Sequence, residues 1–224
     1  MKLSIIMPIY NEEATLKHII EKILSVDIDK ELIIVNDGSI DRSSQILDTI
    51  KNDSIKIIKH SHNQGKGSAI KTGLSCVTGD IVVIQDADLE YDPADYIRLV
   101  EPIVAGEAKV VYGSRFLIKG NSISKSYYAA NRFLTFLTNL LHGSRLTDME
   151  TCYKVFCTDI LKGLDLDSDG FEIEPELTIK ALKKGYKIRE VPIFYQARSY
   201  REGKKITWKD AIKTLLTIFR YKFR

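Results

Sequence analysis

The sequence has few cysteines and no long apolar run. Its three cysteines cannot all pair, and no two of them stand in a CxxC spacing. This pattern excludes a disulfide scaffold and a cysteine zinc site, and it predicts reduced thiols in a cytosolic protein. No stretch of about 18 uncharged apolar residues occurs, so we expect no membrane span. The apolar start is too short for a signal peptide, since Pro8 interrupts it and an acidic pair, Glu12 and Glu13, follows.

The composition is that of a globular domain, with 44% hydrophobic and 28% charged residues among 224. The formal net charge of +3 hides an asymmetry: no acidic residue occurs between positions 108 and 147 or after Asp210, although both segments carry lysines and arginines. A basic face is therefore predicted in the C-terminal half, either simply solvated or facing an anionic partner. No nucleic-acid-binding module is recognised, so nucleic acid is not the expected partner.

Apolar runs and helical periodicities alternate along the first half of the chain. Strands are predicted at 3–7, 32–35, 55–58, 81–84 and 109–112, with helices at 12–24, around 46–50, at 67–77 and from Pro93 onward. This order favours a single α/β domain built on a mostly parallel sheet with right-handed crossovers.

The rhythm changes after Gly113. Helices are predicted at 126–141, 173–184 and 208–223, and strands at 151–156 and 186–191. We expect one domain over 1–206 with two functional halves, about 1–112 and about 113–206. Residues 207–224 are predicted to form a basic, amphipathic C-terminal helix.

Polar clusters follow the first, second and fourth predicted strands, where the ligand crevice of an open α/β sheet lies. Asp86 and Asp88 stand two positions apart, so on an extended backbone both side chains point the same way. A divalent cation resolves the repulsion of two such carboxylates, and Mg²⁺ commonly binds one or two carboxylates together with substrate phosphates. A simple turn is the alternative.

The segment NQGKGS at 63–68 looks like a phosphate loop but matches neither GxxxxGK[ST] nor GxGxxG. That counts against a P-loop NTPase and against a dinucleotide-dependent oxidoreductase. The segment is either a helix-entry turn or a border of the nucleotide site, in which case Lys66 contacts the nucleotide.

Together these strings resemble a family 2 glycosyltransferase of GT-A fold, closest to dolichyl- or polyprenyl-phosphate mannose and glucose synthases. The resemblance covers roughly residues 3 to 206 and rests on PIYNE (8–12), VNDGS (35–39), NQGKG (63–67), DAD (86–88), GSR (113–115), TDMETCYK (147–154), Arg198 and EGKKI (202–206). Asn36 stands where the family commonly has Asp, while the second acid of that motif, Asp37, is kept.

The resemblance implies a glycosyltransferase domain over 1–206, with a donor half over about 1–112 and an acceptor half over about 113–206, and a role for each matching position. The base and ribose would be held by Pro8, Tyr10, Glu12, Val35 and Asp37, and the diphosphate would meet Asp86, Ala87 and Asp88. It further implies Mg²⁺ or Mn²⁺ on Asp86 and Asp88, with Glu90 where relatives can place a third ligand, often Gln; phosphate contacts would come from Arg115, Arg198 and Lys204.

The implied reaction is metal-dependent, inverting transfer of a hexose from GDP-mannose or a UDP-glucose-type donor to a polyprenyl or dolichyl phosphate. Such a phosphate is already ionised near neutral pH, its second pKa being about 6, so it needs no general base. The alternative is transfer to a sugar hydroxyl in envelope glycan synthesis, which needs a base, with Asp148 or Glu150 well placed in sequence. A non-catalytic nucleotide-sugar or lipid-binding module is a third hypothesis, disfavoured by the acid pair and the three cations.

Two amphipathic stretches, 126–141 and 208–223, lie in or beside the acid-free segments and carry aromatic-rich stripes. Such a stripe is usually buried in a core. Basic interfacial helices share the pattern. We therefore expect peripheral attachment to the cytoplasmic face of a membrane, either directly or through a separate anchoring partner.

Overall fold

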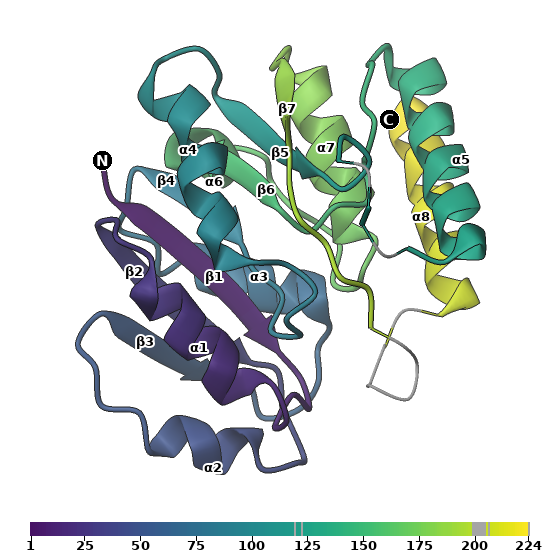
Figure 1. Ribbon diagram of the computed structural model, residues 1–224. Helices are drawn as coiled ribbons and strands as arrows, with labels where there is room; N and C mark the ends of the chain where they lie inside the picture. Colours follow the sequence, from purple (N-terminus) through teal and green to yellow (C-terminus); the bar gives the residue numbers. More distant parts are fainter. Residues whose placement is uncertain (119, 122, 199–204, 206, 224) are drawn as a thin grey trace.

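The computed structural model describes residues 1–118, 120–121, 123–198, 205 and 207–223 (Figure 1). Its seven-stranded sheet has the order β3-β2-β1-β4-β6-β5-β7. Strand β6 runs antiparallel to both β4 and β5, whereas the other neighbours are parallel. The predicted mostly parallel α/β sheet is therefore confirmed. The strands are β1 (Leu3–Ile9), β2 (Lys30–Asn36), β3 (Ile55–Lys59), β4 (Ile81–Ile84), β5 (Val110–Ser114), β6 (Lys154–Cys157) and β7 (Ile188–Pro192).

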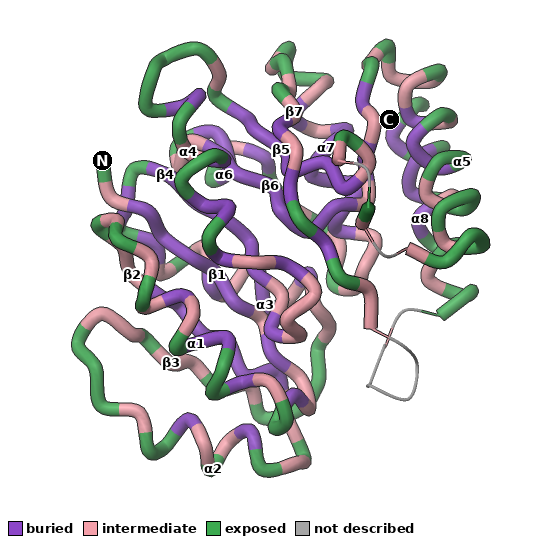
Figure 2. The backbone as a smooth tube through the Cα atoms, viewed as in Figure 1, coloured by how far each residue is buried: buried purple, intermediate pink, exposed green. Residues whose placement is uncertain are grey.

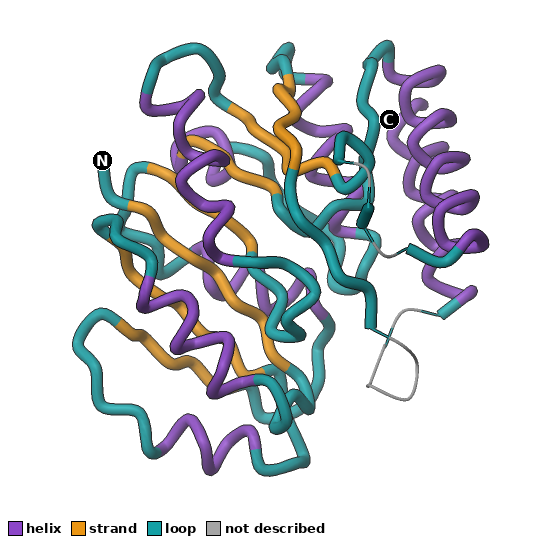
Figure 3. The backbone as a smooth tube through the Cα atoms, in the orientation of Figure 1, coloured by secondary structure: helices purple, strands orange, loops and turns teal. Residues whose placement is uncertain are grey.

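Helices cover both faces of the sheet (Figure 3). They are α1 (Leu16–Ser25), α2 (Ser43–Asp48), α3 (Lys66–Leu74), α4 (Tyr96–Val104), α5 (Lys125–His142), α6 (Thr158–Lys162), α7 (Ile173–Lys183) and α8 (Trp208–Phe223). Pro93 opens a 3₁₀ turn, η1 (Pro93–Asp95), which Asp92 caps by accepting from the Ala94 backbone amide, and α4 follows directly. The five-residue helix α6 was not predicted from the sequence, and the strand expected at 151–156 begins only at Lys154.

The core surrounds the central strand, β4, and extends along the buried strands on both sides of it (Figure 2). All four residues of β4 are buried, as its uninterrupted β-branched sequence predicts for a strand covered on both faces. Helix α3 packs on β1 and β2, and α4 packs on β5. This packing fixes the carboxyl ends of β1, β2 and β4 relative to one another.

Helix α8 packs against α5 and α7, and its Tyr221 hydroxyl donates to Glu176 Oε1 at 2.8 Å. The expected boundary at residue 206 lies outside the described residues. No helix in the described part of the chain is both long enough and apolar enough to cross a membrane.

Candidate active site

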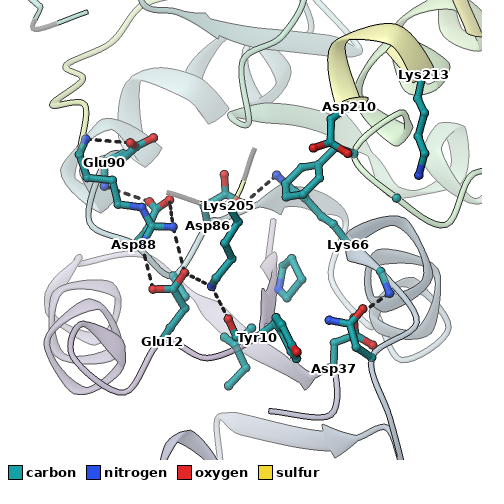
Figure 4. A pocket seen from close by; sticks show the side chains of 18 residues that line it. Tyr10, Glu12, Asp37, Lys66, Asp86, Asp88, Glu90, Lys205, Asp210 and Lys213 are labelled. Carbon is teal, nitrogen blue, oxygen red and sulfur yellow. Dashed lines mark hydrogen bonds and ion pairs between the residues drawn. The ribbon is translucent and has the colours of Figure 1, made fainter. Parts of the chain in front are cut away.

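A cavity of about 380 Å³ opens beyond the carboxyl ends of β1, β2 and β4 (Figure 4). Many of the residues singled out from the sequence line it, although they come from separate strand ends. These are Pro8, Tyr10, Glu12, Asp37, Lys66, Asp86, Ala87, Asp88, Glu90 and Arg198. The volume falls in the range of about 300–1,000 Å³ typical of small-molecule sites.

At the floor of the cavity, Asp86 is paired with a buried lysine. Lys66, the first residue of α3, places its Nζ 2.7 Å from Asp86 Oδ1 and 3.0 Å from Glu174 Oε1. Burial disfavours the lysine charge, but Asp86 and Glu174 outweigh it and raise the pKa of Lys66 well above its usual value. Burial likewise opposes ionisation of Asp86, yet Lys66 holds its pKa below the ordinary range. Both groups are therefore charged at neutral pH.

Asp88 is in the opposite situation. Burial and the neighbouring charges of Asp86 and Glu90 raise the pKa of Asp88 to about 7, although Arg198 opposes the shift. Leu89, which lies between Asp88 and Glu90, has a left-handed backbone with φ of 63°, a conformation costing an L-residue about 1–2 kcal/mol. The carboxylates of Asp86, Asp88 and Glu90 repel one another, and a cation bound beside them would relieve that repulsion.

Two positively charged side chains from the segment after β7, Arg198 and Lys205, contact the carboxylate of Glu12. The Arg198 guanidinium places NH1 and NH2 3.0 Å from the two Glu12 carboxylate oxygens, and its NH2 also lies 3.2 Å from Asp88 Oδ2. Lys205 donates to Glu12 Oε1 and to the Tyr10 carbonyl oxygen (Figure 4). The cavity therefore carries positive groups on its rim beside the acids of its floor.

Asp37 fixes the NQGKG loop. Its carboxylate accepts from the backbone amides of Gln64 and Gly65, at 2.9 and 2.8 Å, and contacts His60 Nδ1 at 2.7 Å. Gly65 has φ of 101°, and a Cβ there would lie 2.3 Å from the Asp169 carbonyl oxygen. The glycine thus permits both the turn and the close approach of a distant segment, and the loop borders the cavity without the geometry of a P-loop.

Arg115 does not line the cavity. Its Nε and NH2 donate to the two carboxylate oxygens of Asp148, both at 2.7 Å, and NH2 also donates to Asn131 of α5 at 3.3 Å. Arg115 is 8% exposed and Asp148 not at all. Asp148 as a general base stays a prediction, and this geometry counts against it, because both of its oxygens are buried and accept from Arg115.

The structure bears on two further predicted site residues, and a third falls outside it. Val35 is fully buried, near Gly73 of α3, and does not line the cavity. Glu90 accepts from the Tyr195 hydroxyl at 2.7 Å and from the Arg198 amide at 2.8 Å, contacts that tie it to the segment after β7. Lys204 lies outside the described residues.

Four more cavity residues, Ile9, Asn63, Gly65 and Lys205, stand inside the recognised motifs but had no individual role predicted for them. The sequence did not indicate the remaining lining residues, which are Gly170, Phe171, Asp210 and Lys213. Phe171 and Glu174 could not be predicted, because they reach the site from the α7 region, far along the chain.

Within the described residues, no group of three or more His, Cys, Asp or Glu side chains is arranged to hold a metal ion on its own. Asp86 and Asp88 are two carboxylates at the end of one strand. Hard cations such as Mg²⁺ typically take one or two protein carboxylates and complete their shell with substrate phosphates and water. The donor set therefore fits a cation that binds together with a diphosphate.

Sheet order, helices and cavity together define an α/β protein with the GT-A fold. The model of glycosyl transferase family 2 matches residues 4–164. The chain belongs to glycosyl transferase family 2 and is a glycosyltransferase.

Two curated relatives and one solved structure show what this chain is similar to. The UDP-N-acetylglucosamine–dolichyl-phosphate N-acetylglucosaminyltransferase of Methanococcus voltae is 32% identical over 84% of this chain and 83% of its own length. The dolichol-phosphate mannosyltransferase of Pyrococcus furiosus is 27% identical over 98% of this chain and 63% of its own. Glucosyl-3-phosphoglycerate synthase of Mycobacterium tuberculosis, solved with Mn²⁺, uridine diphosphate and glucosyl-3-phosphoglycerate, has a TM-score of 0.75 at 20% identity, covering 99% and 80% of the two chains.

Proposed function

We propose that this protein transfers a hexose from a nucleotide sugar to a polyprenyl or dolichyl phosphate, with inversion at the anomeric carbon and with Mg²⁺ or Mn²⁺. The observation that carries the proposal is the composition of the cavity: paired acids on the floor and lysine and arginine groups around them. The names of the two curated relatives, both dolichyl-phosphate sugar transferases, support the acceptor class.

Asp86 and Asp88 would hold the divalent cation, which neutralises the charge of a departing nucleoside diphosphate when bound. The chain supplies the remaining charge stabilisation itself. Lys66 stands at the floor beside Asp86, and Arg198 and Lys205 stand above Glu12, where phosphate oxygens could replace the glutamate as partners. Preorganised cations in a water-poor cavity stabilise developing negative charge far better than water does.

The acceptor phosphate needs positioning rather than deprotonation, because it is already ionised. In-line attack of a phosphate oxygen on the anomeric carbon forms the new C–O bond as the bond to the nucleoside diphosphate breaks. An α-linked donor would then give a β-linked lipid product. Arg115 is proposed to attract the acceptor phosphate by its charge without lining the cavity, because Asp148 holds it over the ring of Tyr195, whose hydroxyl donates to Glu90 of the cavity.

A radiolabel transfer assay tests this proposal. Purified protein with Mg²⁺ or Mn²⁺ is given UDP-glucose, UDP-N-acetylglucosamine or GDP-mannose, with and without a polyprenyl phosphate, and the products are extracted into organic solvent. We expect label in the organic phase only when lipid phosphate and metal are both present, and a β signal in the anomeric proton spectrum. An α-linked product would refute inversion, and donor hydrolysis without lipid product would refute the acceptor.

One observation favours a second candidate, transfer to a sugar hydroxyl. Glu150 has a buried carboxylate oxygen, Oε1, with no hydrogen-bond partner, and burial raises the pKa of Glu150 to about 7, while Lys154 opposes the shift. A base of that pKa suits proton abstraction at neutral pH. If the acceptor is a hydroxyl, we propose Glu150 rather than Asp148 as the base, because both Asp148 oxygens accept from Arg115 whereas Glu150 Oε1 has no partner among the described residues.

Glu150→Gln separates the two candidates. A hydroxyl transferase should lose about 100-fold or more in turnover, within the usual range for loss of a general base. A phosphate transferase should retain most of its turnover in this variant. The pH profile of its rate near pH 7 should also be the same in the variant and in the unmodified protein. Asp148→Asn is a poor test, since it would break the buried pair with Arg115.

We further propose that the outer faces of α5 and α8 rest on an anionic membrane. The two helices pack together and bury four threonines together with Leu134, Ile218 and Tyr221, but they leave most of their large apolar side chains exposed. The exposed side chains include Tyr128, Phe133, Phe136 and Leu140 of α5 and Trp208, Ile212, Leu216, Phe219 and Phe223 of α8. Such an exposed apolar surface marks a binding face.

Charge identifies the proposed partner. Helices α5 and α8 carry Lys125, Arg132, Lys209, Lys213, Arg220 and Lys222, against Asp210 alone among acids. Each basic residue near an anionic headgroup surface adds about 1 kcal/mol to binding. The cysteines are free, which fits a reducing compartment, so the leaflet proposed is the cytoplasmic one.

Flotation with liposomes tests this face. We expect the protein to float with vesicles of anionic lipid at low salt, and Leu216→Glu with Phe133→Glu to abolish flotation. Ile97→Glu is the matched control, since Ile97 of α4 is 56% exposed but lies on a different helix. Failure of the unmodified protein to float would refute direct attachment and leave a separate protein anchor as the explanation of the face.

A further inference from the structure

Four charged side chains form a chain of contacts that runs from the cavity floor, where Asp86 and Lys66 lie, to the buried residues Glu174 and Lys154. Asp86 contacts Lys66, Lys66 contacts Glu174 Oε1 at 3.0 Å, and Lys154 donates from the other side to Glu174 Oε2. Lys154 is fully buried and Glu174 is 4% exposed. Glu174 therefore bridges two lysines that have little access to water.

The two contacts of Glu174 differ in kind. Lys154 makes a hydrogen bond to Oε2 and another to the Thr151 carbonyl oxygen at 2.6 Å. The contact between Lys66 and Oε1 is close in distance, but Oε1 accepts no aligned hydrogen bond. Lys154 is thus locked in place, whereas Lys66 is held to Glu174 by charge and faces the cavity as well.

The arrangement raises a problem for cation binding at Asp86. A lysine 2.7 Å from one Asp86 oxygen opposes a divalent cation at the same carboxylate. Without another anion nearby, Asp86 would be the counter-ion of Lys66 and would not be available to a cation, since an unpaired charge with little access to water is strongly unfavourable. Glu174 is the other anion that the structure places against Lys66.

We propose that Glu174 is a positioning residue that balances the charge of Lys66 and so leaves Asp86 available to a divalent cation. This inference rests on the metal-dependent function proposed above. Glu174 comes from the first turn of α7, so the acceptor half of the chain sets the cation affinity of the donor half. It acts through Lys66 and touches neither substrate.

The test is a titration with Mn²⁺, following free Mn²⁺ by electron paramagnetic resonance, alone and with UDP or GDP present. Glu174→Gln keeps the shape and an acceptor oxygen but removes the charge. We expect it to weaken Mn²⁺ binding about tenfold or more, a size set by loss of one charge from a poorly solvated cluster. Glu172→Gln is the matched control, two positions away and outside the lysine pair, and should change binding less than about twofold.

A double-mutant cycle shows whether the effect passes through Lys66. In a Lys66→Met background, Glu174→Gln should have little further effect, because no cavity lysine remains to be balanced. An equal loss in both backgrounds would overturn the proposal, since Glu174 would then act only as a distant negative charge or as a packing residue.

A charge-balanced variant covers the case in which Glu174→Gln does not fold. Glu174→Gln with Lys154→Met removes one buried charge of each sign and should still weaken Mn²⁺ binding. Unchanged affinity in this variant would overturn the proposal while leaving the proposed function intact. If the unmodified protein binds Mn²⁺ no better than Asp86→Asn under any of these conditions, the metal-dependent function itself fails.

Discussion

The two ends of the sheet surround a half-buried carboxylate in opposite ways. At the amino ends of β1 and β2, Glu31 accepts hydrogen bonds from Ser4, from the Thr78 hydroxyl and amide, and from Lys2. Burial alone would raise the pKa of Glu31, but these donors lower it to about 2. At the carboxyl end of β4, burial and neighbouring acids raise the pKa of Asp88 to about 7.

The difference separates a stabilising clamp from a binding site. Donors at the amino end satisfy their carboxylate completely from within the chain, so ionised Glu31 stabilises the fold. The acids at the carboxyl end repel one another in the unliganded protein, and a ligand has to resolve that repulsion. Sites of function commonly carry such a cost in stability, and in an open α/β sheet they lie at this end.

The largest effect that would test the comparison is the loss of activity in Asp88→Asn. We expect sugar transfer to fall by about 100-fold or more, because the cation loses one of two proposed carboxylates. Stability at pH 8 should not fall, since the substitution removes a repelled charge. Asp92→Asn is the control: Asp92 caps η1 and pairs with Lys22 outside the cavity, and it should keep its activity. If Asp88→Asn transferred the sugar at the rate of the unmodified protein, Asp88 would not be a ligand of the cation.

The converse substitution, Glu31→Gln, should change stability and not activity. The side-chain amide of the glutamine would place an NH₂ group among the donors that now surround Glu31, and the negative charge that those donors stabilise would be lost. We expect a loss of about 2 kcal/mol in the free energy of unfolding, below the upper value that the pKa difference implies because Glu31 is partly solvated. Thermal melting should drop by about 4–8 °C. Glu101→Gln, at an exposed position of α4, is the control, and an equal loss there would show that the clamp is not special.

The pH dependence of the same two variants should have opposite signs. Glu31 is lowered from 4.5 to about 2, so its stabilisation is complete above pH 4.5 and is lost as the pH falls toward 2. Asp88 is raised from 3.8 to about 7, so its cost is absent near pH 3.8 and is complete above pH 7. Urea unfolding of the metal-free variants at pH 4, 5.5 and 8 should show the advantage of Asp88→Asn growing with pH. A constant difference would contradict the raised pKa.

Much of the fold could be predicted from the sequence, because strand and helix periods are local. The strand Ile81–Ile84 and the helix Trp208–Phe223 have the predicted bounds. The missed helix α6 is shorter than the window in which a helical period can be recognised. The orientation of α8 differed from the usual expectation, since its apolar stripe faces outward and Thr214 and Thr217 face the core. Only tertiary packing decides such a choice.

The predicted site residues were those that follow strands directly, such as Asp86 and Glu12. Their positions are set by the sheet, which the periodicity predicts. What could not be predicted is the set of partners across the chain. From the sequence alone, Asp148 is predicted to be an available acid. In the structure both of its oxygens accept hydrogen bonds from Arg115, which is 33 positions away in the chain. Glu174 gives no signal, because only the packing of α7 places it beside Lys66.

The smallest expected effect on stability is that of replacing Lys2, at the amino end of the sheet, and it is compared with the replacement of Lys66 at the carboxyl end. Lys2 lies 3.0 Å from Glu31 Oε2 with its side chain 36% exposed, whereas the Lys66 side chain is 10% exposed. Lys2→Met should cost less than about 0.5 kcal/mol, because water screens the pair and Ser4 and Thr78 still hold Glu31. Lys66→Met should instead weaken nucleoside diphosphate binding at least tenfold, the value of about one charge-assisted contact. Calorimetric titration with UDP and GDP and urea unfolding measure the two effects side by side. If Lys2→Met proved as costly to stability as Glu31→Gln, the clamp would depend on a single ion pair, and the contrast between a multiply satisfied end and an unsatisfied end of the sheet would not hold.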